Sequence, residues 1–362
     1  MGQRMTARTL AARLRMNFEA AGARVVEPPY LQPAETLLDL YGEDIRARAY
    51  VTIDALRGEQ MLRPDFTVPV VQMHMSDGAE PARYTYAGEV FRRQEQDEDR
   101  ANEYLQVGYE VFDRADPASA DAEVFALIAL QLRDMPVRAA TGDIGILMAA
   151  VQGLNTTDLR KSALMRHIWR PRRFRALLDQ FSGRSVMPES RKKLLSTEGV
   201  LTGQMPAIGK RRPGEVDARV DALRQDAAQP PIAENELLAL EALMAVRETI
   251  PYASEQMRDI AVDLPAITPA LDRLEARTAA MKARGINVDA LDFEASYGRT
   301  SMEYYDGFVF GFYADARPDL PVIASGGRYD ALTRHLGSGA EIPAVGGVLR
   351  PDLMVRLEGT TS

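Results

Sequence analysis

Polar side chains suited to binding a charged ligand are concentrated between Val90 and Phe112, in the segment VFRRQEQDEDRANEYLQVGYEVF. Arg92 leads into a charged loop, and the returning stretch carries Gln106 and Glu110. Successive side chains of a strand point to opposite faces, so residues four positions apart point the same way. The spacing therefore predicts an antiparallel hairpin whose alternate side chains point into a single pocket.

Other segments must form the elements that position this hairpin. Residues 7–21 have apolar side chains at helical spacing, with Thr6 suited to begin a helix and Gly22 to end it. The stretch 23–31 predicts a strand marked by two prolines, which fit a sheet edge but not a helix interior. Further predicted elements are strands at 50–53, 60–62, 291–294, 307–313 and 343–349, a helix through His74, a helix over 118–132, a tight turn into a short helix at 324–330, and a final helix.

The composition is that of an ordinary globular protein. With 362 residues, of which 46% are hydrophobic and 27% charged, the chain can form one large domain and an inserted segment. It has no Cys and three scattered His, so we expect no disulfide, no metal site and no cofactor. We also expect no signal peptide and no membrane span, which makes the cytoplasm the expected location. The net charge of -8 argues against a protein whose main function is to bind nucleic acid.

Residues 155–250 differ in composition and in the spacing of apolar residues from the rest of the chain. Leu, Ala, Arg and Glu recur there at helical spacing between Pro and Gly breaks, which predicts a mostly helical insertion. A basic run within it could meet an acidic partner or RNA, but a solvated helix face is the preferred interpretation. The run consists of Arg160, Lys161, Arg166, Arg170, Arg172, Arg173 and Arg175.

Four ordered blocks resemble histidyl-tRNA synthetase, a class II aminoacyl-tRNA synthetase. They are LRPDFT (62–67), the hairpin (90–112), EYYDGFVF (303–310), and GGRYDAL with PAVGG (326–332 and 343–347). The hairpin is similar to motif 2 of that class, and the first helix with its Pro-marked strand resembles motif 1, which forms dimers. The resemblance implies an α+β fold, a class II synthetase-like antiparallel sheet flanked by helices. It implies one such domain over 1–362, with a helical insertion at about 155–250, no anticodon-binding domain and a homodimeric assembly.

The same resemblance implies a histidine-binding pocket. The residues that match it are Asp65, Thr67, Arg92, Gln106, Glu110, Tyr304 and Tyr305. Asp65 matches a family acid that, with the residues matched by Thr67 and Gln106, holds the amino group. An acid is the group that an ammonium needs.

Further residues match those with which the family binds the imidazole and the carboxylate of the ligand. Glu110 and Tyr305 match the pair that binds the imidazole, in which a carboxylate accepts one ring N–H and a phenol serves the other nitrogen. Arg92 matches the motif 2 arginine, whose planar fork suits a carboxylate or an α-phosphate. Tyr104 falls where the family places an aromatic ring against adenine.

Each of these residues alone has a simpler interpretation. Arg and Glu across a hairpin are more often an exposed cross-strand pair, and Tyr304 and Tyr305 would usually be core and rim aromatics. Taken together and in family order, the residues favour the pocket.

Two positions depart from the synthetase pattern. Thr300 stands where the family has an Arg that stabilises adenylation, although Arg299 is adjacent, and Leu353 stands where motif 3 has the Arg that clamps the γ-phosphate. Arg350 lies three residues earlier, before a proline. Losing one such cation costs roughly a hundred- to a thousandfold in rate, so we expect little adenylation. Five acids in the hairpin loop, between Glu95 and Glu103, would also repel a triphosphate and an acceptor stem.

A synthetase-like core with a histidine pocket, no ATP clamp and no anticodon-binding domain resembles the regulatory subunits of ATP phosphoribosyltransferase. This resemblance implies a protein that is not itself an enzyme. It would assemble with the short-form catalytic subunit, activate the first step of histidine biosynthesis and take part in feedback inhibition by L-histidine, with no tRNA bound.

Two alternatives remain open at this point. The first is a truncated histidyl-tRNA synthetase-like enzyme that adenylates histidine and transfers it to a non-tRNA acceptor. The second is an RNA-binding module that uses the basic run from Arg160 to Arg175, which the acidic net charge makes the least favoured.

Overall fold

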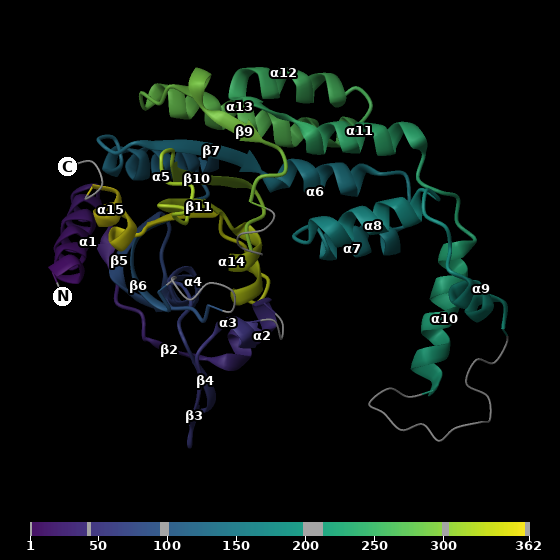
Figure 1. The fold of residues 1–362 in the computed structure, drawn as a ribbon, viewed down its shortest axis with the longest axis horizontal. Coiled ribbons are helices and arrows are strands. Elements are labelled where there is room, and N and C mark those ends of the chain that lie inside the picture. The colour runs from purple at the N-terminus through teal and green to yellow at the C-terminus, as the bar shows by residue number, and fades with distance from the viewer. Residues whose placement is uncertain (1, 42–44, 95–100, 198–212, 299–303, 359–362) are drawn as a thin grey trace.

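A nine-stranded mixed sheet forms the centre of the protein (Figure 1). The computed structural model describes residues 2–41, 45–94, 101–197, 213–298 and 304–358. In spatial order the strands are β1 (Arg24–Val25), β5 (Ala82–Phe91), β6 (Glu103–Phe112), β12 (Ala344–Leu349), β11 (Ala324–Arg328), β10 (Phe308–Ala314), β7 (Val137–Asp143), β9 (Asp292–Glu294) and β8 (Arg247–Thr249). β1 runs parallel to β5 and β9 parallel to β7, whereas the other neighbours are antiparallel. The sheet is therefore mainly antiparallel, as predicted.

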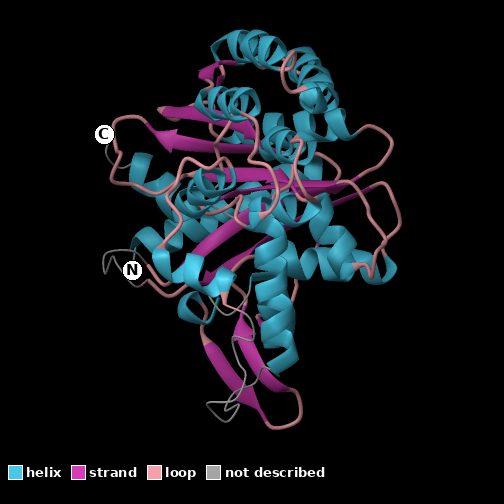
Figure 2. Cartoon of the chain, turned by 90° about the vertical axis from the view of Figure 1, so that its right-hand side faces the viewer, coloured by secondary structure: helices cyan, strands magenta, loops and turns pink. Residues whose placement is uncertain are grey.

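A three-stranded sheet projects from the body of the molecule (Figures 1 and 2). Its strands, in spatial order, are β2 (Leu31–Pro33), β4 (Gly58–Leu62) and β3 (Val51–Asp54). β3 and β4 confirm the strand pair predicted around 50–62. The single strand predicted over 23–31 is wrong in extent, because only the short β1 and the start of β2 form there. Pro28 and Pro29 lie between them, and proline cannot donate a hydrogen bond to a neighbouring strand.

Helices cover both faces of the large sheet. On one face α1 (Gly2–Ala20), α5 (Pro117–Gln131) and α15 (Pro351–Glu358) pack on the strands, and α13 (Thr268–Ala283) packs on α5. On the other face α4 (Thr67–Asp77) and α14 (Asp330–Leu336) share a second core with α2 (Ala34–Tyr41) and α3 (Ile45–Arg48). Further helical elements are α6 (Ile144–Gly153), α12 (Ile250–Ile260), and the 3-10 turns η1 (Pro265–Ile267) and η2 (Val288–Ala290).

Five helices occur between residues 155 and 250 in the described part of the chain. They are α7 (Asp158–Arg166), α8 (Pro171–Phe181), α9 (Glu189–Ser196), α10 (Pro213–Ala227) and α11 (Glu234–Ala245). α9 and α10 stand away from the sheet (Figure 1). One residue of the basic run departs from the predicted solvated face. Arg160 is buried, and its Nε donates to Asp226 on α10 at 2.6 Å.

The predicted hairpin is confirmed by β5 and β6. They pair along their full length, from Ala82 opposite Phe112 to Phe91 opposite Glu103. Along β6, Leu105, Val107, Tyr109 and Val111 enter the core shared with α1. The alternate residues of β6, Gln106 and Glu110 among them, therefore face the other side of the sheet, where the second core lies.

The turn predicted at 324–330 is wrong, because residues 324–328 form the central strand β11. This strand pairs with both β10 and β12. A Cβ on Gly326 would overlap the Phe310 ring, so glycine is needed here for close packing inside the sheet, where the sequence pattern suggested a turn. The short helix that was predicted to follow does form, as α14.

Candidate functional site

A cavity of about 90 Å³ lies on the face of the large sheet that carries Gln106. Strands β6, β10, β11 and β12 contribute to its wall, together with the start of α4. Six of the seven residues expected to bind histidine line it: Asp65, Thr67, Arg92, Gln106, Tyr304 and Tyr305. The volume is several times the roughly 10–15 Å³ that a single water requires. The fold thus gathers these side chains around one space large enough for part of a small ligand.

An acceptor end of the cavity is formed by Asp65 and Gln106. Asp65 is buried, and its Oδ1 accepts a hydrogen bond from the Val68 N–H at 3.2 Å in the first turn of α4. The helix dipole favours a negative charge at that position. Gln106 is 2% exposed, and its Oε1 has no hydrogen-bond partner among the described residues. A buried acceptor without a donor carries a desolvation cost that a ligand N–H would relieve, so this end suits an ammonium group.

Glu110 does not line the cavity but lies one layer behind its wall. The sequence analysis had predicted it within the wall. Its carboxylate accepts hydrogen bonds from the hydroxyls of Thr67 at 3.0 Å, Tyr86 at 2.8 Å and Tyr329 at 2.6 Å. Burial raises the pKa of Glu110 to about 7, although the three hydroxyl donors act in the opposite direction. Burial and the charge of Glu110 also raise the pKa of Tyr305. Glu110 therefore acts on the cavity through Thr67 and Tyr305.

Gly346 on β12 makes room for the Glu110 carboxylate, because a Cβ on Gly346 would overlap Glu110 Oε2. Gly346→Ala is therefore expected to lower the free energy of unfolding by about 1–3 kcal/mol or more, measured by urea denaturation. Gly214→Ala in α10 is the control, since a Cβ there meets nothing within 4 Å. We expect it to be neutral or to stabilise by up to about 1 kcal/mol. Equal stability of Gly346→Ala and the unmodified protein would refute this placement of Glu110.

A cationic end of the cavity is formed by Arg92 and Arg350. Arg92 follows β5, and its Nε donates to the Pro64 carbonyl at 2.8 Å. Arg350 follows β12, and its guanidinium carbon lies 5.5 Å from the centre of the Tyr104 ring. Leu353, at the expected position of the phosphate clamp, packs instead against the core beneath α15. Two guanidinium groups beside an acceptor end suit a ligand that carries both an anion and an ammonium.

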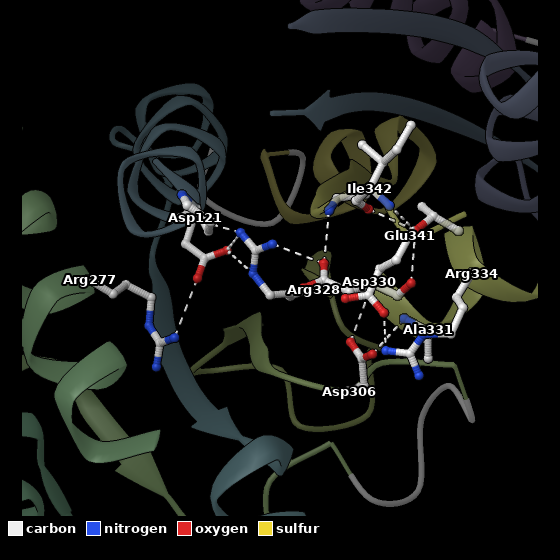
Figure 3. Close-up of polar contacts among 12 residues, drawn as sticks. Asp121, Arg277, Asp306, Arg328, Asp330, Ala331, Arg334, Glu341 and Ile342 are labelled. Atoms are coloured by element: carbon white, nitrogen blue, oxygen red, sulfur yellow. Dashed lines mark hydrogen bonds and ion pairs between the residues drawn. The ribbon is translucent and has the colours of Figure 1, made fainter. Parts of the chain in front are cut away.

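The segment that carries Tyr304 and Tyr305 is anchored by Asp306 (Figure 3). The Asp306 carboxylate accepts the backbone N–H of Asp330 at 3.0 Å and that of Ala331 at 2.6 Å, at the start of α14. Burial and the nearby charge of Asp330 raise the pKa of Asp306 to about 7, against the effect of the two N–H donors. Asp306 thereby fixes the two tyrosines relative to α14.

Two tyrosines of the cavity wall were missed by the sequence analysis. The hydroxyls of Tyr297 and Tyr313 lie 2.8 Å apart, and both rings line the cavity. Tyr313 shares one face of β10 with Val309, so alternation along the predicted strand could have indicated it. Tyr297 lies outside any strand, and its position depends on close packing over Gly311, which no sequence spacing reveals.

Some expectations concern residues outside the described ranges, namely Thr300 with Arg299 and the hairpin-loop acids from Glu95 to Asp99. Within the described ranges no cluster of three or more His, Asp or Glu is placed to hold a metal ion. None of the helices there is both long enough and apolar enough to cross a membrane.

Comparison with solved structures identifies the fold. A structure described as an ATP phosphoribosyltransferase regulatory subunit/histidyl-tRNA synthetase from Bacillus halodurans matches with a TM-score of 0.68 and 20% identity, covering 98% of this chain and 79% of that one. Histidyl-tRNA synthetase from Nostoc sp. matches with a TM-score of 0.65 and 17% identity, covering 99% and 73%. The fold is that of a class II, histidyl-tRNA synthetase-like protein, which confirms the predicted fold class.

Sequence comparison then gives the family. The model of the family described as Histidyl-tRNA synthetase matches residues 3–353. Curated proteins from Brucella ovis and Brucella abortus, both named ATP phosphoribosyltransferase regulatory subunit, are 31% identical over 370 residues, or 96% of this chain and 96% of theirs. The chain belongs to the histidyl-tRNA synthetase-like family of ATP phosphoribosyltransferase regulatory subunits.

Proposed function

We propose that this chain is the non-catalytic regulatory subunit of a short-form ATP phosphoribosyltransferase, which performs the first step of histidine biosynthesis. It forms a homodimer that assembles with the catalytic subunit in the cytoplasm, raises the activity of that subunit and allows L-histidine to lower it. The observation that carries the proposal is the 31% identity, over 96% of both chains, to proteins named as such regulatory subunits.

The cavity supports L-histidine as the effector. Asp65 and Gln106 provide acceptors for an ammonium group, and the cationic end formed by Arg92 and Arg350 suits a carboxylate. Tyr304 and Tyr305 contribute phenol groups beside them, which suit the imidazole nitrogens. Feedback requires that histidine bind one state of the assembly more tightly than another, and this difference in affinity is the entire coupling free energy.

The position of Leu353 supports a role without catalysis. In the synthetases that the chain resembles, this position carries the cation that clamps the γ-phosphate, whereas here an apolar side chain packs against the core. An apolar residue cannot stabilise the charge that develops during phosphoryl or adenylyl transfer.

The test measures the ATP phosphoribosyltransferase activity of a purified short catalytic subunit with and without this chain, across a histidine titration. We expect this chain to stimulate the activity and histidine to suppress it, with a coupling of about 5- to 150-fold. The matched variant Asp65→Asn should still assemble but respond to histidine only at higher concentrations. No change in rate and no complex by size-exclusion chromatography would overturn the proposal. Histidine-dependent ATP–pyrophosphate exchange would instead favour the adenylating enzyme.

A further inference from the structure

We propose that Arg350 binds the α-carboxylate of the amino-acid ligand, so that the cavity selects a free amino acid over the corresponding amine. This inference rests on the proposed function, because it takes L-histidine as the ligand. Three features of the described residues support it: the place of Arg350 next to Gln106, the rigidity of its backbone and the balance of charges in the cavity wall.

The register of the sheet brings Arg350 next to Gln106. β12 and β6 are antiparallel, and their last paired residues at this end are Leu349 and Val107. Continuing that register by one residue sets Arg350 across from Gln106, and both line the cavity. Opposed residues of antiparallel strands have Cβ atoms roughly 4.5–5.5 Å apart. The ammonium and carboxylate of an α-amino acid share one carbon atom, so neighbouring acceptor and guanidinium groups match that arrangement.

The backbone of Arg350 is held on both sides. Its N–H donates to the Ile323 carbonyl at 3.0 Å, and its own carbonyl accepts the N–H of Leu353 at 3.0 Å and of Met354 at 3.1 Å. The next residue, Pro351, is the first of α15 and has a restricted φ. The guanidinium lies over the Tyr104 ring, which limits its movement further. Arg350 is therefore preorganised, which reduces the entropy lost when a ligand binds.

The charges of the cavity wall also favour an anion beside Arg350. Among the described lining residues, the acidic and basic side chains are Asp65, Arg92 and Arg350. One carboxylate thus faces two guanidinium groups. When the ligand ammonium lies at Asp65 and Gln106, the carboxylate of the same ligand compensates one of the two guanidinium charges.

The experiment compares the binding of L-histidine and histamine by calorimetry. Histamine has the ammonium and the imidazole but no carboxylate. In the unmodified protein we expect L-histidine to bind about 10- to 100-fold more tightly than histamine. Arg350→Gln should weaken L-histidine by a similar factor and leave histamine nearly unchanged, whereas Arg350→Lys should restore part of the difference. Arg334→Gln, at an exposed site on α14, is the control and should change neither affinity.

Each outcome distinguishes this inference from the proposed function. A loss confined to L-histidine supports carboxylate binding by Arg350. If Arg350→Gln weakens both ligands equally, or weakens neither, Arg350 only packs on Tyr104 and the inference is overturned. If the unmodified protein is folded by circular dichroism but binds no L-histidine, the histidine-binding part of the proposed function is overturned. The inference about Arg350 is then overturned with it.

Discussion

Replacing Glu110 with alanine is expected to lower the free energy of unfolding by about 3–5 kcal/mol, measured by urea denaturation. The hydroxyls of Thr67, Tyr86 and Tyr329 all donate to this carboxylate, and each would lose its acceptor in a buried place. The substitution also leaves a cavity, which adds to the loss. The affinity for L-histidine should fall as well, because the Thr67 hydroxyl in the cavity wall loses the acceptor that orients it. A loss below about 1 kcal/mol would show that the carboxylate does not organise these hydroxyls.

A pH series with Glu110→Gln separates the effect of charge from the effect of packing. The pKa of Glu110 in the folded protein is about 7, above the ordinary value of 4.5. Between these values the folded state keeps a proton that the unfolded state has released, so the stability contributed by this group falls as the pH rises. Relative to Glu110→Gln, the unmodified protein should therefore lose about 2–3 kcal/mol between pH 5 and pH 8. A stability difference between the two proteins that stays constant over this range would contradict the raised pKa.

The second large effect is expected for Asp121→Ala, at the centre of a buried network of charges (Figure 3). Asp121 on α5 accepts hydrogen bonds from Arg328 Nε at 3.0 Å and Nη2 at 2.7 Å, and from Arg277 Nη1 at 3.4 Å. Arg277 also donates to Asp143 at 2.8 Å. Removing the shared acid leaves two buried guanidinium groups short of a partner, which should lower the free energy of unfolding by about 3–5 kcal/mol.

The network matters for the cavity because Arg328 ends β11, the strand whose Ser325 and Gly326 line the cavity wall. Asp121→Ala should therefore also weaken L-histidine binding in the fraction that remains folded. The control is Asp134→Ala, whose side chain is 88% exposed and should change stability by less than about 0.5 kcal/mol. If Asp121→Ala behaved like this control in urea denaturation followed by circular dichroism, the ion network would not contribute to stability as described.

The sequence alone predicted the class of fold and six of the residues that line the cavity. The blocks at 62–67, 90–112, 303–310, and 326–332 with 343–347 occur in an order typical of one family. The alternation in the hairpin predicted which face of β6 holds Gln106. Such local patterns predict strands and helices correctly because strand periodicity and helix capping depend on neighbours within a few residues.

Only the tertiary structure decided which side chains touch. Arg350, set aside in the sequence analysis because it precedes Leu353 by three residues, lines the cavity, since the β6 and β12 register sets it across from Gln106. Glu110 lies behind the wall because hydroxyls from three different elements converge on it. Residues 324–328 form a strand because partners on both sides complete their hydrogen bonds. Such contacts join segments far apart in the chain, and periodicity within one segment holds no information about them.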